Sequence, residues 1–208
     1  MSSVVARTEA LARGVRLEVI TVVWMAAEAA LAIGAGVAAR SVLLTAFGAD
    51  SVIELLSGVT LLWRLRAEAR GGHVGTVDRA DRVATWISAG LLILLCVYVA
   101  ATSVAGLVLR IEPERSYLGI GVSLLALVVM PLLASRKRAV NATLQNPALR
   151  ADIAESLTCA YLAAVTLVGI GVAALTGWWW FEYIAAFALL RWLVPEALEA
   201  LEAARGDE

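Results

Sequence analysis

The chain has 208 residues, of which 61% are hydrophobic and 17% charged, and its formal net charge is −1. A soluble domain carries about 25% charged residues and less apolar content, so this composition excludes an ordinary soluble domain and indicates an integral membrane protein. The basic residues flank the apolar segments instead of forming one patch, and we therefore expect no binding to nucleic acid.

The apolar segments predict an all-α membrane protein. A helix needs roughly 20 residues to cross a bilayer, and six segments reach about that length: residues 17–39, 41–63, 83–109, 117–134, 151–176 and 179–197. Residues 198–208 follow as a short tail. Residues 1–16 contain Arg7, Arg13 and Arg16 but no apolar stretch, so we expect a cytoplasmic segment and not a cleavable signal peptide.

The basic residues are distributed unevenly between the two ends of these helices. With the N-terminus inside the cell, the inner segments hold 14 of the 17 lysine and arginine residues, and the outer ones hold only Arg40, Arg110 and Arg115. Cytoplasmic loops carry such an excess of basic residues. Both termini are therefore expected in the cytoplasm.

The connections between the spans give further expectations. Residues 39–41 leave room only for a turn, so the first two spans should form an antiparallel hairpin. His73, the only histidine, lies in a glycine-rich loop, and a lone histidine does not make a metal site. Pro131 should kink or end the fourth helix, and Asn146 followed by Pro147 predicts the start of the fifth.

Two acids lie near the middle of the second span. Asp50 and Glu54 are four residues apart, so they share one face of a helix, and neither has a basic residue three or four positions away. An ionisable side chain at the centre of a membrane helix costs roughly 2.5 kcal/mol or more unless it meets a polar partner. Protonation or hydrogen bonds across the bundle could neutralise these acids, but a cation site or a proton relay is the interpretation that we favour.

Glu155 and Cys159 form a matching pair on the fifth span, again four residues apart. With Asp50 and Glu54 they would supply carboxylate oxygens and one thiolate from two helices. Such a donor set suits zinc or another divalent transition metal, whereas magnesium and calcium take oxygen ligands. Because these ligands must lose their protons to bind a metal, the pattern predicts a site at which a metal ion exchanges for protons.

Further acids inside the spans have less defined roles. Asp152 could be a ligand, an acid at the entrance of the site, or an ion-pair partner of Arg150 or Arg191. Glu28, deep in the first span, could support a ligand or carry a proton. Two other acids lie near opposite membrane boundaries, where we expect partial solvation: Glu18 and Glu182.

The two acidic motifs resemble those of the cation diffusion facilitator family. Residues 44–58, L-T-A-F-G-A-D-S-V-I-E-L-L-S-G, resemble a segment in which Asp or His is followed after three residues by Asp, and Asp50 and Glu54 stand at those positions. Residues 149–159 resemble L-x-A-D-x-x-H-x-x-x-D. Here Glu155 replaces the histidine and Cys159 the last Asp, while Asp152 keeps the preceding Asp, which is usually not a transport-site ligand in that family.

The chain also resembles short bacterial members of that family, which share the D-S-V-I-E and C-A-Y-L motifs and a run of tryptophans before the last span. This resemblance implies a cation-efflux-type helical bundle in the bacterial inner membrane. Many relatives dimerise with the help of a cytoplasmic metal-binding domain, which we do not expect here. A homodimer should then form through the transmembrane helices.

The function implied by the resemblance is secondary active export of a divalent transition-metal cation from the cytoplasm, in exchange for protons and by alternating access. The metal would be the substrate and no cofactor is expected; zinc is the first candidate, with iron, manganese, cobalt and cadmium as alternatives. A proton-coupled transporter of a non-metal substrate and a non-transporting metal-binding membrane protein are the other functions left open. Without a phosphate-binding glycine loop or a His-containing triad, we expect no enzyme.

Overall fold

The protein was analysed as a computed structural model that describes residues 2–69 and 75–206, with side chains described for 6–69, 82–83 and 85–205. The described chain forms six α-helices and no strand. The helices are α1 (Ser2–Ala39), α2 (Val42–Ala69), α3 (Gly75–Leu109), α4 (Tyr117–Leu144), α5 (Pro147–Thr176) and α6 (Trp180–Gly206). The prediction of an all-α fold with six helices is confirmed, and His73 lies outside the described residues.

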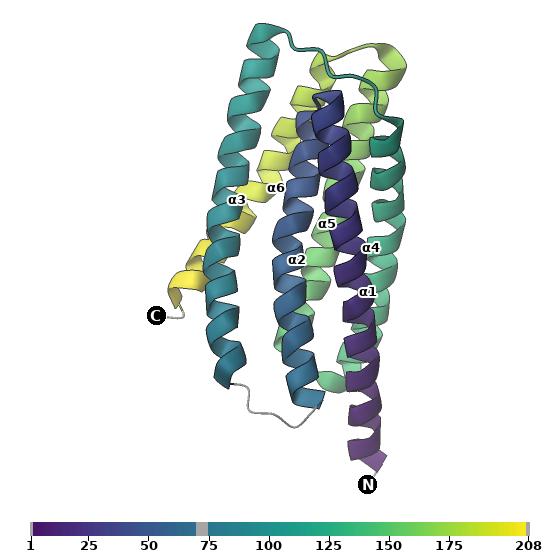
Figure 1. Ribbon diagram of the computed structural model, residues 1–208, viewed down its shortest axis with the longest axis vertical. Coiled ribbons are helices and arrows are strands. Elements are labelled where there is room, and N and C mark those ends of the chain that lie inside the picture. The colour runs from purple at the N-terminus through teal and green to yellow at the C-terminus, as the bar shows by residue number, and fades with distance from the viewer. Residues whose placement is uncertain (1, 70–74, 207–208) are drawn as a thin grey trace.

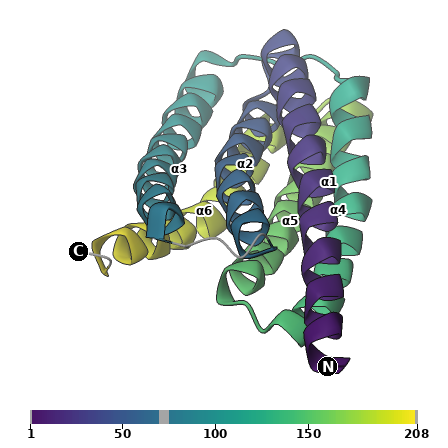
Figure 2. The same ribbon diagram turned by 60° about the horizontal axis from the view of Figure 1, so that its bottom comes forward.

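Four of the helices form a closed bundle, and the other two pair at its side. α1 packs against α2 and α4, and α5 packs against α4 and α2. α3 and α6 contact each other, with α3 also against α2 and α6 also against α5 (Figure 1). The start of α1, the end of α2 and the start of α5 lie at the same end of the molecule, and α6 slants across the bundle toward α3 (Figure 2).

Five helices are long and apolar enough to cross a membrane. These stretches are Ala6–Ala39, Val42–Ala69, Thr85–Leu109, Tyr117–Leu144 and Pro147–Thr176. The sixth predicted span lies in α6, a helix of similar length that carries Glu182, Arg191 and Glu196 among its apolar residues. These charges interrupt its apolar sequence, and α6 is not among the five helices.

α4 continues well beyond the predicted span. Pro131 lies inside the helix, which runs on to Leu144, so this proline does not end it. A proline removes one backbone hydrogen bond, but the residues that follow it are held by packing. Lys137 and Asn141 are buried beyond Pro131, where α4 lies against α1 and α5. Tertiary contacts therefore outweigh the local preference for a helix end.

The start of α5 is confirmed as predicted. Oδ1 of Asn146 accepts hydrogen bonds from the backbone N–H of Ala148 at 2.9 Å and of Leu149 at 3.2 Å. Pro147 is the first helical residue, where its missing N–H costs nothing. This cap sets the phase of α5, and Asp152 and Cys159 are buried on its inner side.

The predicted α1–α2 hairpin is also confirmed. Arg40 turns the chain with a φ of 53°, and Ser41 caps α2 by accepting from the N–H of Leu44 at 3.1 Å. Glycines let the two backbones approach: a Cβ at Gly36 would lie 2.5 Å from the backbone nitrogen of Thr45. The close contact of the two helices brings acids of α1 and α2 into one interior.

Candidate cation site

Asp50 and Glu54 lie inside the bundle on α2. Their exposed fractions are 2% and 6%. Among the described residues, Oδ2 of Asp50 and both carboxyl oxygens of Glu54 have no hydrogen-bond partner. The largest electrostatic interactions of the two groups are with other acids, namely Glu196, Glu155 and Glu28 in addition to each other. The groups around this pair are therefore acidic as well. Buried carboxylates, however, require a cation or a proton to neutralise them.

Glu28 connects three helices beside this pair. It is 1% exposed on α1, and its Oε2 accepts a hydrogen bond from Nε1 of Trp24 at 2.6 Å. Its Oε1 accepts from the hydroxyl of Ser51 on α2 at 2.7 Å and from the thiol of Cys159 on α5 at 3.3 Å. Because Ser51 follows Asp50 in α2, this carboxyl group lies next to the acidic pair.

The expected face of α5 points toward the same region. Cys159 is fully buried and interacts electrostatically with Glu54, Glu28 and Asp50. Glu155, which is partly exposed, interacts with Asp152 and with Glu196 on α6. Within the described residues, no three His, Cys, Asp or Glu side chains lie close enough together to hold a metal ion. The predicted donors are thus gathered in one region without forming a coordination shell.

One member of this region was missed by the sequence analysis. Glu196 on α6 is partly buried, and its Oε2 is buried without a hydrogen-bond partner in the described part of the chain. It interacts electrostatically with Asp50. Its position inside the last apolar segment, directly after Pro195, was the available signal. We call the set Glu28, Asp50, Glu54, Glu155, Cys159 and Glu196 the acid cluster.

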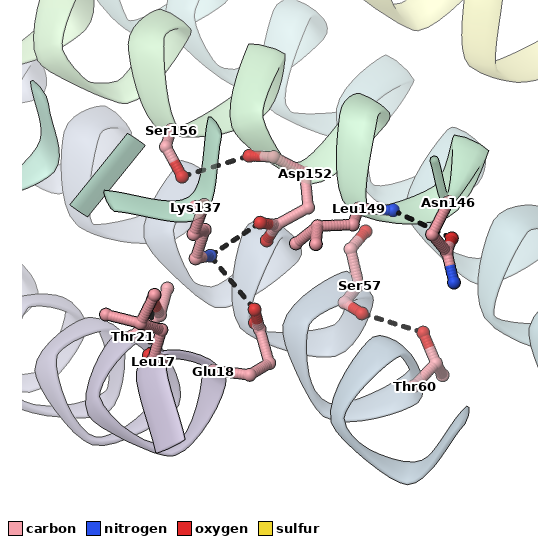
Figure 3. A network of polar contacts seen from close by, with 10 residues as sticks. All are labelled: Leu17, Glu18, Thr21, Ser57, Thr60, Lys137, Asn146, Leu149, Asp152 and Ser156. Carbon is pink, nitrogen blue, oxygen red and sulfur yellow. Dashed lines mark hydrogen bonds and ion pairs between the residues drawn. The ribbon is translucent and has the colours of Figure 1, made fainter. Parts of the chain in front are cut away.

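A second cluster surrounds Lys137, the only lysine of the chain, which is 1% exposed on α4. Its Nζ lies 2.5 Å from Oδ2 of Asp152 on α5 and 3.0 Å from Oε2 of Glu18 on α1 (Figure 3). We call these three residues the Lys137 cluster. It joins the three helices by buried ion pairs.

These contacts correct two expectations. Asp152 is bound by Lys137 and not by Arg150 or Arg191, both of which are exposed, because α4 packs directly against α5 and carries Lys137 into the interface. Glu18 is fully buried and not partly solvated, because α1 packs against α2 and α4 and the side chain lies between Gly58 and Lys137.

Glu182 near the opposite end is likewise buried, with 2% exposure, so the expectation of partial solvation is wrong here too. Its Oε1 accepts a hydrogen bond of 2.6 Å from the hydroxyl of Ser41, the residue before α2. A carboxylate is favourable at the N-terminus of a helix. This acid therefore has a structural role in joining α6 to the start of α2.

The sequence was compared with known proteins. No curated protein matches it. A family model described as the cation efflux transmembrane domain matches residues 19–204. This range includes the whole acid cluster and begins one residue after Glu18. Together with the helical bundle and its buried acids, a match over most of the chain shows that the protein belongs to the cation efflux family, whose members are membrane transporters of cations and not enzymes.

Proposed function

We propose that the protein exports a divalent transition-metal cation from the cytoplasm, with zinc as the first candidate, in exchange for protons. The observation that carries this proposal is the burial of Asp50 and Glu54 with three carboxyl oxygens that lack a hydrogen-bond partner among the described residues. Buried charges that lack a partner are costly, so these groups need a proton or a cation. A site that holds one or the other in turn is suited to their exchange.

The proposed ligands are Asp50, Glu54, Glu155 and Cys159. Asp152 is engaged by Lys137, which leaves Glu155 and Cys159 as the donors that α5 can offer on this side. A thiolate among carboxylates favours a transition metal over magnesium or calcium. The cation is the substrate and not a cofactor.

Glu28 supports Cys159 in this proposal. Its Oε1 accepts a hydrogen bond from the thiol of Cys159, with an S···O distance of 3.3 Å, and the carboxyl group also accepts hydrogen bonds from Ser51 and Trp24. A thiol must lose its proton before it binds a metal. Until then, the hydrogen bond to the adjacent carboxylate fixes the orientation of the thiol. Groups that orient ligands in this way contribute to metal affinity.

Transport would then follow from movement of α5 relative to α2. The donors share one region, but no three of those described lie within coordinating distance. Binding would draw Glu155 and Cys159 toward Asp50 and Glu54, and release to the other side would separate them. This alternation is our proposal for alternating access, with protons replacing the cation on the carboxyl groups.

The excess of basic residues at one end of the helices supports an orientation with both termini in the cytoplasm. We place the protein in a bacterial inner membrane, where such an exporter would act. A homodimer formed through transmembrane helices is part of the same proposal.

The proposal is tested by zinc-driven proton movement in proteoliposomes that contain a pH-sensitive dye. Glu54→Gln and Glu155→Gln should each abolish the proton signal, because both remove a proposed ligand and a proton carrier. Cys159→Ser should weaken zinc binding measured by calorimetry. The matched controls are Cys96→Ser, which changes the other free cysteine, and Glu68→Gln, which changes an acid paired with Arg7 outside the interior.

The outcomes separate the alternatives. Unchanged transport in both glutamine variants would contradict the ligand assignment. Zinc binding that depends on Cys159 but produces no flux would indicate a non-transporting metal-binding protein. Proton movement with another substrate, and without stoichiometric zinc binding, would indicate a proton-coupled transporter of a non-metal compound.

A further inference from the structure

The Lys137 cluster is buried in the bundle and contains none of the proposed metal ligands. Its three side chains come from α1, α4 and α5 and meet in the interior, as Figure 3 shows. Glu18 and Lys137 are 0% and 1% exposed. Neither residue is used by the proposed cation site, so the cluster requires its own explanation.

The cluster contains one acid more than its single cation can neutralise. The main charged neighbours of Glu18 are Asp152 on α5 and Lys137 on α4. Glu155, also on α5, interacts with the same group from further along the helix. From α2 the group is faced by Gly58, which carries no charge: a Cβ there would lie 3.2 Å from Oε1 of Glu18. With both acids ionised, the cluster has a formal charge of −1.

Glu18 is the acid whose carboxyl oxygens do not use their capacity to accept hydrogen bonds. Asp152 receives a hydrogen bond of 2.5 Å from Nζ of Lys137. Glu18 lies 3.0 Å from the same nitrogen, but neither of its carboxyl oxygens makes a hydrogen bond within the described chain. A buried carboxyl oxygen ordinarily accepts one. The geometry therefore divides the cluster into a short, hydrogen-bonded ion pair, Lys137 with Asp152, and a longer ion pair to Glu18, whose carboxyl group still has room to accept a proton.

We propose that Glu18 binds a proton, and that this proton is one of those exchanged for the transported cation. In this step the Glu18 carboxylate takes one proton and becomes a carboxylic acid, while Lys137 and Asp152 keep their charges. The cluster changes from a charge of −1 to neutral, and release returns the proton to water. The exchange rests on the proposed transport function, whereas proton binding by Glu18 does not.

The position of the cluster links it to the cation site. Asp152 precedes Glu155 by one helical turn of α5, and both Lys137 and Glu18 interact electrostatically with Glu155. A charge on Glu18 adds to the negative potential at Glu155 and favours a bound cation there. A proton on Glu18 removes that contribution and favours cation release. Occupation of the two sites is therefore opposed, as exchange requires.

The first test needs no metal. Infrared difference spectra of the purified full-length protein between acidic and alkaline buffer report the C=O stretching band of protonated carboxyl groups. Glu18→Gln should lose one component of this band, and Glu18→Asp should retain it at a shifted frequency. An identical band in wild type and Glu18→Gln would overturn the proposal. Glu18→Asp keeps the carboxyl group and tests it independently of how well the glutamine variant folds.

The second test measures protons moved per zinc ion in proteoliposomes. Glu18→Gln should still take up zinc but lose one proton per zinc ion, so its uptake should depend less on the pH gradient. Glu182→Gln is the matched control, since it neutralises another buried carboxyl that is held by Ser41, and its ratio should equal that of wild type.

An unchanged ratio in Glu18→Gln would overturn the exchange role of Glu18 while leaving the proposed zinc transport intact. If wild-type vesicles move no zinc, the proposed function fails, and the infrared band alone then decides whether Glu18 binds a proton.

Discussion

Asp50 and Glu54 of the acid cluster are buried to a similar degree as the Lys137 cluster, but the two groups differ in what faces their carboxyl groups. In the Lys137 cluster, Asp152 and Glu18 lie 2.5 and 3.0 Å from an ammonium nitrogen. In the acid cluster, the charged groups that act on Asp50 and Glu54 are other acids. Burial therefore does not distinguish the two regions. They differ because a cationic side chain, that of Lys137, is present in only one of them.

This difference separates a structural charge from a transport site. A carboxylate with a permanent partner needs nothing from solution, whereas one without a partner must take up a proton or an ion. The acid cluster belongs to the second kind. The Lys137 cluster combines both, because Lys137 has one permanent charge for two acids. Changes to each cluster should consequently affect stability with opposite signs.

The largest effect is expected from Lys137→Met. This change leaves Asp152 and Glu18 buried without a cation, and removing one partner of a buried ion pair costs about 3–5 kcal/mol. We expect a marked decrease in the thermal unfolding temperature of the detergent-solubilised protein. Arg138→Met, the exposed neighbouring residue, should change the free energy of unfolding by less than about 0.5 kcal/mol.

The double variant Lys137→Met/Asp152→Asn should recover part of the loss, because it also removes one of the two stranded charges. Equal unfolding temperatures for Lys137→Met and Arg138→Met would show that the buried ion pairs do not hold α1, α4 and α5 together.

A smaller effect of opposite sign is expected from Glu54→Met. Both oxygens of Glu54 lack hydrogen-bond partners within the described chain, and an unsatisfied buried polar group costs about 1–3 kcal/mol. Removing it should raise the unfolding temperature in metal-free buffer. Added zinc should stabilise the wild type by mass action but not this variant. A variant that unfolds earlier than wild type without metal would show that Glu54 has a structural partner.

Much of the fold could be predicted from local signals. The number of helices follows from the apolar segments, and the short connection around Arg40 required the α1–α2 hairpin. Asn146 and Pro147 form a cap whose chemistry is confined to neighbouring residues. The helix ends were less predictable, because α1 and α6 extend beyond their apolar segments as well. In α4 the continuation past Pro131 depends on packing against other helices, which no local pattern reports.

For the candidate site, too, local sequence patterns predicted some features and missed those that depend on contacts between helices. Spacing of four residues predicted which side chains of one helix share a face. Cys159 is buried and interacts electrostatically with acids of α2, whereas the partly exposed Glu155 interacts with Asp152 and Glu196, and the ligand set stays a prediction. Spacing carries no information about partners on other helices. Lys137 stands between Arg136 and Arg138 and therefore resembled a cytoplasmic basic run. The contact of Glu28 with Cys159 joins residues 131 positions apart, and only the packing of α1 against the bundle produces it.

The smallest effect expected concerns Gly58 and leaves every charge unchanged. A Cβ at Gly58 would lie 3.2 Å from Oε1 of Glu18 and 3.4 Å from a methyl group of Val22. The carboxyl group is the end of a flexible side chain and can move by a few tenths of an ångström, so Gly58→Ala should cost less than about 1 kcal/mol. Gly34→Ala adds the same methyl group where nothing lies within 4 Å.

Although its effect on stability is small, Gly58→Ala should shift the infrared band assigned to Glu18, because the added methyl group displaces the carboxyl group relative to Lys137. Gly34→Ala should leave the band unchanged. If neither variant shifts the band, the contact of α2 with Glu18 at Gly58 does not determine the environment of the Glu18 carboxyl group. The ammonium group of Lys137 would then be the dominant influence on Glu18. The difference between the two clusters would then come from the presence of Lys137 and not from the shape of the surrounding helices.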